Sequence, residues 1–134
     1  MDVTMLLCDA AAESGGKLYV LGGGWSVIRV PNVPTPMALA VKLSVPWDQT
    51  NKQIRVRAKL VTEDGDEVDL GEGPVFAEGT IEVGRPAGMK PGSPIDMPFA
   101  LSFGPLALDT GGYVWELEVD GTTLARTPFR VLGG

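Results

Sequence analysis

Two glutamates, Glu116 and Glu118, have the spacing that acid–base chemistry on carboxylates could use. In a strand they point to one face about 7 Å apart, a separation that suits a glycoside hydrolase built on two carboxylates. A stripe of opposite charge with the same period of two is formed by Arg55, Arg57 and Lys59. If the two strands are neighbours, cross-strand ion pairs explain both stripes. We favour that structural explanation and keep a carboxylate-based hydrolase as the less favoured hypothesis.

The sequence contains no histidine and one cysteine, Cys8. Without histidine, the chain cannot form Ser-His-Asp or Cys-His catalytic groups or use histidine as a metal ligand. One thiol excludes an internal disulfide and a zinc site built on cysteines. Cys8 lies in an apolar run, which predicts a buried, unreactive thiol. We therefore predict a protein that is not an enzyme, with no catalytic residues, no cofactor and no metal site.

The acidic run from Glu63 to Asp69 is the segment whose carboxylates could suggest calcium binding. Its spacing does not match the EF-hand loop, and successive side chains of a hairpin point to opposite faces. The run contains Asp64-Gly65, a dipeptide typical of a tight turn between strands. We expect a solvated hairpin turn.

The three tryptophans could provide stacking surfaces for sugars. Trp25 and Trp115 lie in apolar segments, and we expect them in the core. Trp47 follows Pro46 at the end of a strand and is the candidate for exposure. Together with Asp48, it would form the binding surface of a carbohydrate-binding module, by analogy with other sandwich proteins.

The segment from Gly84 to Pro94 is a long irregular loop with three prolines and three glycines. It carries Arg85, Met89 and Lys90, which we predict as partner- or ligand-binding residues because long loops in compact domains are often functional. A loop stiffened by proline loses less entropy when it binds. The alternative is a plain connection between two sheets.

The elements that must position these residues are short strands. The 134 residues include 18 glycines and 11 prolines, which lie between apolar runs. Alternating apolar residues predict inward faces, most clearly in residues 37–45 and 54–60. We predict one domain over residues 1–134, an antiparallel β-sandwich of immunoglobulin-like or Greek-key type with about eight or nine strands and no substantial helix. A closed barrel is the alternative. The expected strands are residues 2–8, 17–28, 37–45, 54–60, 67–70, 75–83, 95–103, 113–119 and 122–131.

The hub of the prediction is the stretch from Lys17 to Ile28, in which two apolar runs flank Gly22-Gly23-Gly24. No helix-forming segment follows, so this is not a phosphate-binding loop. We expect a strand that pairs with residues 2–8 after a turn over residues 9–16. At the glycines it has either a bulge within one strand or a bend that moves the chain between sheets. The segment Val30–Pro36 contains three prolines and is expected to be an extended connection that crosses from one sheet to another. Pro98 should place its strand at an edge or bulge.

The net charge of −6 argues against a surface for nucleic acid or anionic membranes, which both call for basic residues. The first residues lack a basic, apolar leader, and no apolar run reaches membrane-spanning length. We therefore expect a cytoplasmic protein with no nucleic-acid or membrane partner.

Three groups of residues form a recognisable combination. They are Leu7-Cys8-Asp9-Ala10-Ala11, the hub Lys17-Leu18-Tyr19-Val20-Leu21-Gly22-Gly23-Gly24-Trp25, and Gly112-Tyr113 with Val119-Asp120-Gly121 and Pro128-Phe129. This combination resembles a family of small proteins of unknown function found in bacteria and some of their phages, which would make the chain a virion protein if it belongs to a phage. The resemblance spans nearly the whole chain. It implies a single β domain and brings no catalytic residues.

The leading hypothesis is a non-enzymatic sandwich that acts by binding a protein partner or by self-association. It would suit a structural component of a phage or another bacterial assembly, with Val30–Pro36 as an extended arm that reaches a neighbouring subunit. The alternative is the carbohydrate-binding module, which leaves a small-molecule or glycan ligand open.

Overall fold

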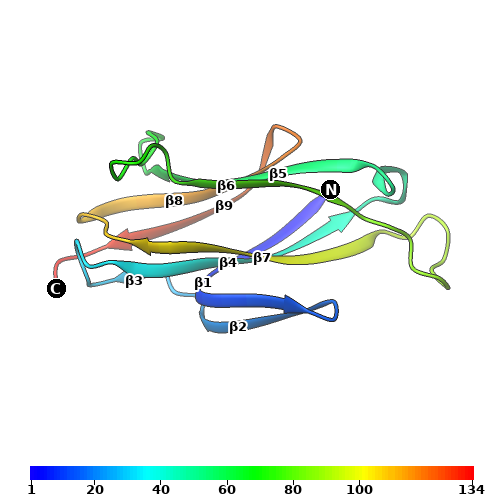
Figure 1. Ribbon diagram of the computed structural model, residues 1–134, viewed down its shortest axis with the longest axis horizontal. Helices are drawn as coiled ribbons and strands as arrows, with labels where there is room; N and C mark the ends of the chain where they lie inside the picture. The colour runs from blue at the N-terminus through cyan, green and yellow to red at the C-terminus, as the bar shows by residue number, and fades with distance from the viewer.

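The computed structural model describes residues 1–134 and is an all-β sandwich of nine strands (Figure 1). One sheet has the strand order β2-β1-β4-β7 and the other β3-β9-β8-β5-β6. All pairings are antiparallel except that of β3 with β9, and the two sheets stay separate. This confirms the predicted fold class. The elements are β1 (Asp2–Ser14), β2 (Lys17–Gly23), β3 (Val27–Ile28), β4 (Thr35–Val45), the 3₁₀ turn η1 (Trp47–Gln49), β5 (Gln53–Thr62), β6 (Phe76–Glu82), β7 (Ile95–Leu106), β8 (Gly111–Val119) and β9 (Thr122–Val131).

None of these elements is a helix with the length and apolar content that a membrane crossing requires. The alternation in the sequence explains the core, because strand residues two apart point to the same face. The predicted inward faces of β4 and β5 are confirmed as buried. They comprise Leu39, Val41, Leu43 and Val45 on β4 and Ile54, Val56, Ala58 and Leu60 on β5.

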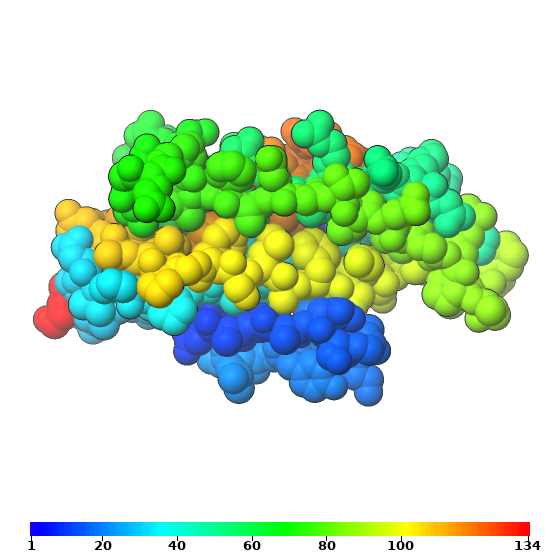
Figure 2. Space-filling view, viewed as in Figure 1, coloured from blue at the N-terminus to red at the C-terminus, as the bar shows by residue number.

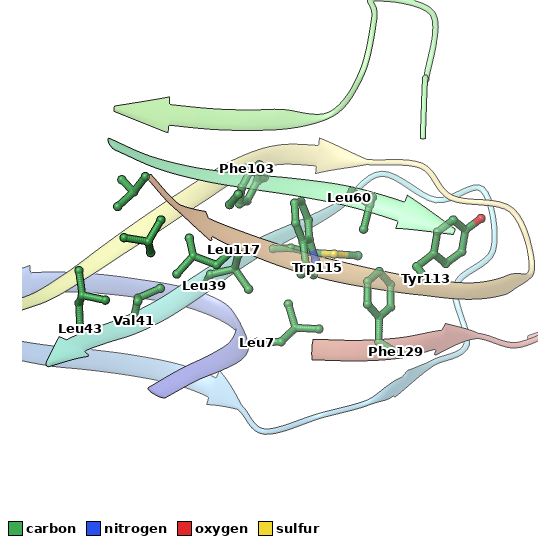
Figure 3. Close-up of a cluster of buried hydrophobic side chains, with 14 of the residues drawn as sticks. Leu7, Leu39, Val41, Leu43, Leu60, Phe103, Tyr113, Trp115, Leu117 and Phe129 are labelled. Atoms are coloured by element: carbon green, nitrogen blue, oxygen red, sulfur yellow. The ribbon is translucent and has the colours of Figure 1, made fainter. Parts of the chain in front are cut away.

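The centre of the sandwich is a contact between two aromatic rings from opposite sheets (Figure 3). Trp115 on β8 is fully buried, and its ring centroid lies 4.2 Å from that of Phe103 on β7. A second aromatic group lies nearby, where Phe129 stacks on Tyr113 and meets the edge of Trp25. The expected core positions of Trp115 and Trp25 are therefore confirmed, although Trp25 is only partly buried.

The strand β1 is longer than the prediction, which ended it at Cys8 and placed a turn over residues 9–16. Residues Asp2–Cys8 pair with β4, and the rest of β1 pairs with β2 as far as Ser14, so the turn consists of Gly15 and Gly16. The small residues around Ala11 form a strand because they pair with the strongly strand-forming segment of β2. Figure 1 shows this hairpin beneath β4 and β7, set apart from the main body.

Of the two alternatives at the hub, the structure shows the bend that moves the chain between sheets, because the two halves of the hub belong to different sheets. The chain leaves the four-stranded sheet at Gly23 and enters the five-stranded sheet at Val27. Gly22 and Gly24 have φ angles of 60° and 84°, a region that favours glycine. The side chain of Asp9 also occupies the space that a Cβ on Gly22 would need. The triplet is therefore the point at which the chain changes sheets.

Two further expectations need correction. The Val30–Pro36 segment does not extend as an arm, because it turns where the Val33 N–H donates to the Val30 carbonyl (3.3 Å). The Asn32 N–H also donates to the Leu108 carbonyl (2.7 Å), which ties the segment to the body of the protein. It connects the two sheets, as its position between β3 and β4 requires. The predicted strand at residues 67–70 contributes only isolated bridges, since the Asp69 carboxylate instead accepts the N–H groups of Gly71 and Gly73.

The edge position expected for Pro98 is confirmed, since β7 is the last strand of its sheet. The predicted turn at Asp120-Gly121 is also confirmed, with positive φ at both residues. Such turns match the twist of the strands they connect and fix their register.

We expect Phe103→Ala to lower the free energy of unfolding by about 3 kcal/mol, because it removes the ring that covers Trp115. Urea denaturation followed by tryptophan fluorescence would measure the change. Phe76→Ala is the matched control, since Phe76 is 43% exposed and should cost much less. Equal losses for the two variants would contradict the central role of the Phe103–Trp115 contact.

Candidate functional site

Trp47 and Arg85, two of the predicted binding residues, are in contact at one end of the sandwich. The Arg85 guanidinium carbon lies 4.0 Å from the centroid of the Trp47 ring. Its Nε donates to Thr50 Oγ1 (2.7 Å), and its Nη2 donates to the Trp47 carbonyl (2.8 Å). These contacts anchor the start of the 84–94 loop on η1. Figure 1 shows this loop at the end of the molecule opposite the C-terminus.

The other predicted binding residues, Asp48, Met89 and Lys90, do not all lie in one site with Trp47 and Arg85. Trp47 is half-buried against the core, and exposed Asp48 lies beside it in a shallow pocket. Met89 and Lys90 are exposed on the loop and do not line this pocket. A sugar that stacked on the ring face covered by Arg85 would have to displace the guanidinium. The pocket is lined by Met1, Asp2, Ser44, Pro46, Trp47, Asp48, Gly92 and Pro94.

The two charge stripes lie on neighbouring strands, as the ion-pair interpretation required. Lys59 Nζ lies 3.0 Å from a carboxylate oxygen of Glu118 and 4.0 Å from one of Glu116. Glu116 is only 7% exposed and also pairs with Arg126, whose Nε donates to it at 2.6 Å. Both carboxylates that could have served a hydrolase are therefore held by cations.

The sequence reasoning missed the role of Arg126 on β9. The approximate pairing of Arg126 with Glu116 could have been predicted from the sequence. Counting residues outward in both directions from the predicted turn at Asp120-Gly121 brings Arg126 near Glu116. A bulge between Leu117 and Glu118 shifts the exact pairing. Turn chemistry could have suggested the partner, whereas the bulge could not be read from the residues.

Arg55 and Arg57 do not form the ion pairs that their stripe suggested. Neither guanidinium has a carboxylate oxygen within ion-pairing distance. Arg57 instead lies over the Phe76 ring at 4.6 Å, and its buried Nε has no hydrogen-bond acceptor. Both arginines line a groove on the outer face of the five-stranded sheet. The groove is lined by Arg55, Val56, Arg57, Glu78, Gly79, Thr80, Glu118, Asp120 and Gly121.

The acidic run does not form a cluster of ligands for a metal ion. No group of three or more acidic or cysteine side chains is placed to hold one. Glu63 pairs with Arg130 across Gly112, where a larger residue would collide with the Glu63 carboxyl group. Asp69 caps the following glycine-rich turn through its carboxylate.

The thiol of Cys8 is fully buried, which confirms the expected burial. It donates a hydrogen bond to the Ala38 carbonyl (3.3 Å). Burial raises the pKa of Cys8 above its ordinary value, and the nearby charge of Asp9 raises it further. A protonated thiol without solvent access is a poor nucleophile.

The exposed apolar surface is concentrated on the N-terminal quarter of the chain, which the sequence reasoning did not single out. Seven of the eleven exposed large apolar side chains lie there. The sequence signal that could have found them is the run of apolar residues on both faces of β2. Figure 2 shows the hairpin of β1 and β2, in blue, projecting below the rest of the molecule. The seven are Leu6, Tyr19, Val20, Leu21, Val27, Val30 and Val33.

Comparison with known proteins identifies a family for this chain. The model of DUF6941, described as a family of unknown function, covers residues 3–132. No curated protein and no solved structure matches. The match agrees with the resemblance in its extent and supplies neither an activity nor a ligand.

We expect Glu116→Gln to lower the free energy of unfolding by about 1 to 2 kcal/mol, because it breaks a buried, charge-assisted contact with Arg126. Chemical denaturation at neutral pH would measure the loss. Glu78→Gln is the control, since Glu78 lies on the same outer face and has no ion pair. An unchanged midpoint for Glu116→Gln would contradict the structural role of this carboxylate.

Stability should fall at alkaline pH because two buried acids ionise more readily in the unfolded chain. Burial raises the pKa of Cys8 above its ordinary value of 9.0 and that of Tyr113 above 10.0. Their contribution is complete below these ordinary values and is lost as pH rises through the folded pKa values. Tyr113 also loses the hydrogen bond that its hydroxyl donates to the Asp109 carbonyl.

Thermal unfolding scans between pH 7 and pH 11 would test this expectation. Cys8→Ala should flatten the first part of the decline and Tyr113→Phe the later part. If the double variant declined as steeply as the original chain, these two groups would not be the cause.

Proposed function

The chain belongs to the DUF6941 family, whose function is unknown, and we propose that it is a non-enzymatic assembly protein that self-associates through β2. The observation that carries the proposal is the free outer edge of β2, which ends the four-stranded sheet. An unpaired edge presents a row of backbone N–H and C=O groups to any strand that can pair with them.

The other three sheet edges carry features that discourage strand pairing. β7 contains Pro98, β6 carries outward Glu78 and Glu82, and β3 has only two residues. Proline, charge and short length are the usual ways in which proteins protect an edge. β2 has seven residues, no proline and a single charge, Lys17, at its first position. It is therefore the edge best suited to accept another strand.

The hairpin also exposes apolar side chains beside this edge. Tyr19 is 58% exposed and Leu21 is 72% exposed, and both face the same side as their partners Ala12 and Ala10 on β1. The opposite face of the hairpin packs through Ala11 and Leu18 on the cluster of Cys8, Ala38 and Ala40. An apolar patch on one face of an exposed ribbon is typical of a contact surface.

The edge of β2 is uncharged enough to accept a second copy of the chain as its partner. The molecule has a net charge of −6, which makes two copies repel each other, but the segment from Leu18 to Ile28 carries no charge. If β2 pairs antiparallel with β2 of another copy about Val20, Tyr19 lies opposite Leu21 of the second copy. Lys17 then lies opposite a glycine, so no like charges oppose each other.

Such pairing would join two four-stranded sheets through a two-fold axis. The hairpin projects from the body, which leaves its edge accessible (Figure 2). The motif resemblance supports a finer version of the proposal, in which this dimer is a building unit of a bacterial or phage assembly.

Size-exclusion chromatography with light scattering over a wide concentration range would test self-association. We expect a species of twice the 14.1 kDa of one chain, in a concentration-dependent equilibrium. Tyr19→Lys and Leu21→Lys should shift the equilibrium to monomer, because lysine protects an edge. Leu124→Lys is the matched control, since Leu124 is also an exposed leucine but lies on β9.

A strict monomer at every concentration would overturn self-association through β2. A dimer that persisted in both lysine variants and dissociated in Leu124→Lys would place the interface on β9 instead. A folded spectrum for each variant, recorded by circular dichroism, would separate loss of pairing from loss of fold.

A further inference from the structure

We propose that the groove beside Arg55 and Arg57 binds a carboxylate group between the two guanidinium groups. This site lies on the outer face of the five-stranded sheet and does not depend on self-association through β2. The carboxylate could belong to a small free acid or to an acidic side chain of a peptide. The two sources share the chemistry that the groove recognises.

The position of Arg57 is the first observation. Its cross-strand neighbours are Glu78 on β6 and Glu118 on β8, yet it pairs with neither carboxylate. Its guanidinium lies over the Phe76 ring instead. Stacking on an aromatic ring holds the planar guanidinium in place without using its hydrogen-bond donors. Arg57 is thus oriented and still has donors to offer.

The unsatisfied donor of Arg57 is the second observation. Its Nε is buried and has no acceptor. A buried donor without an acceptor costs free energy, so the guanidinium of Arg57 is not fully satisfied within the chain. Because Nε itself is shielded from solvent, a ligand in the groove would bind to the terminal nitrogens of the guanidinium. The remaining donors of the guanidinium form a fork that matches the two oxygens of a carboxylate.

Arg55 provides the second cation of the groove. Its backbone N–H donates to the Asp120 carboxylate (2.9 Å), and the Asp120 N–H donates to the Arg55 carbonyl (2.8 Å). The β8–β9 turn therefore holds the Arg55 backbone, while its guanidinium makes no ion pair. Alternate residues of a strand share a face, so both arginines project into the same groove.

The other charges around the groove favour a carboxylate over a more highly charged anion. Glu118 is paired with Lys59, and Asp120 accepts a backbone N–H, so both are already engaged. Glu78 remains unpaired on the groove wall. A phosphate dianion would meet stronger repulsion from these acids than a singly charged carboxylate would.

Titration of the intact chain with sodium glutarate, followed by amide chemical shifts, would test the proposal. We expect shifts at Arg55, Val56, Gly79, Thr80 and Gly121, which line the groove. Arg57→Gln should weaken the affinity about tenfold, because one charged contact is lost. Arg57→Lys keeps the charge but loses the fork, and it should weaken binding about threefold. Arg29→Gln is the matched control, since Arg29 is exposed outside the groove.

A blocked Gly-Glu-Gly peptide and inorganic phosphate complete the experiment. If the peptide binds more tightly than glutarate, the source is a protein side chain, and the reverse order indicates a small acid. Phosphate that bound at least as tightly as both would overturn the assignment to a carboxylate. Absence of shifts with glutarate and the peptide, or shifts that Arg57→Gln did not weaken, would overturn the site. Because self-association is not measured here, its failure would be seen separately by light scattering.

Discussion

The close contact of β1, β2 and β4 at Cys8 determines which face of the β1–β2 hairpin is buried and which stays exposed. Cys8 pairs with Gly23 on β2 and with Ala38 on β4, and β1 passes at this residue from one neighbour to the other. Ala38 and Ala40 point away from the main core and are nonetheless buried, at 1% and 4% exposure. The hairpin covers them through Ala11 and Leu18. Larger side chains at these positions would lift the hairpin from the sheet.

The same contact explains why one face of the hairpin is apolar and exposed. A ribbon of two strands has two faces, and only one can pack on the alanines of β4. The strand β2 has apolar residues on both faces, so burial of one face leaves Tyr19 and Leu21 in solvent. Since an isolated hairpin is marginally stable, its attachment at Cys8 is what keeps this exposed strand in order.

The sequence predicted the fold where a local pattern sufficed and failed where a distant contact decided the outcome. Alternation in β4 and β5 and the dipeptide Asp120-Gly121 identified the strands and their turn without knowledge of their partners. The length of β1 and the change of sheet at Gly22–Gly24 depend on which strand lies alongside, and a single sequence does not state this.

The candidate sites were also predictable where a local pattern sufficed and unpredictable where they depended on contacts between distant residues. The charge stripes predicted that β5 and β8 are neighbours, which the register confirms. They did not predict which cations would be used, because that depends on lateral tilts of long side chains. Lys59 tilts toward Glu118, while Arg57 tilts toward Phe76. The contact between Trp47 and Arg85 joins two loops that are far apart in the chain, and no spacing rule applies to such a pair.

The motif residues that link the chain to its resemblance occupy positions that the fold requires. Gly22 makes room for Asp9, Gly112 makes room for the Glu63–Arg130 pair, and Phe129 packs on Tyr113. These residues support the architecture of this chain through packing and close approach of its strands. The two surfaces that we propose for binding use the motifs differently. The proposed groove depends on Arg55 and Arg57, which lie outside the motifs, and on a wall that includes the motif residues Asp120 and Gly121. The proposed contact through β2 uses side chains of the hub itself, Tyr19 and Leu21, beside the free edge of the sheet.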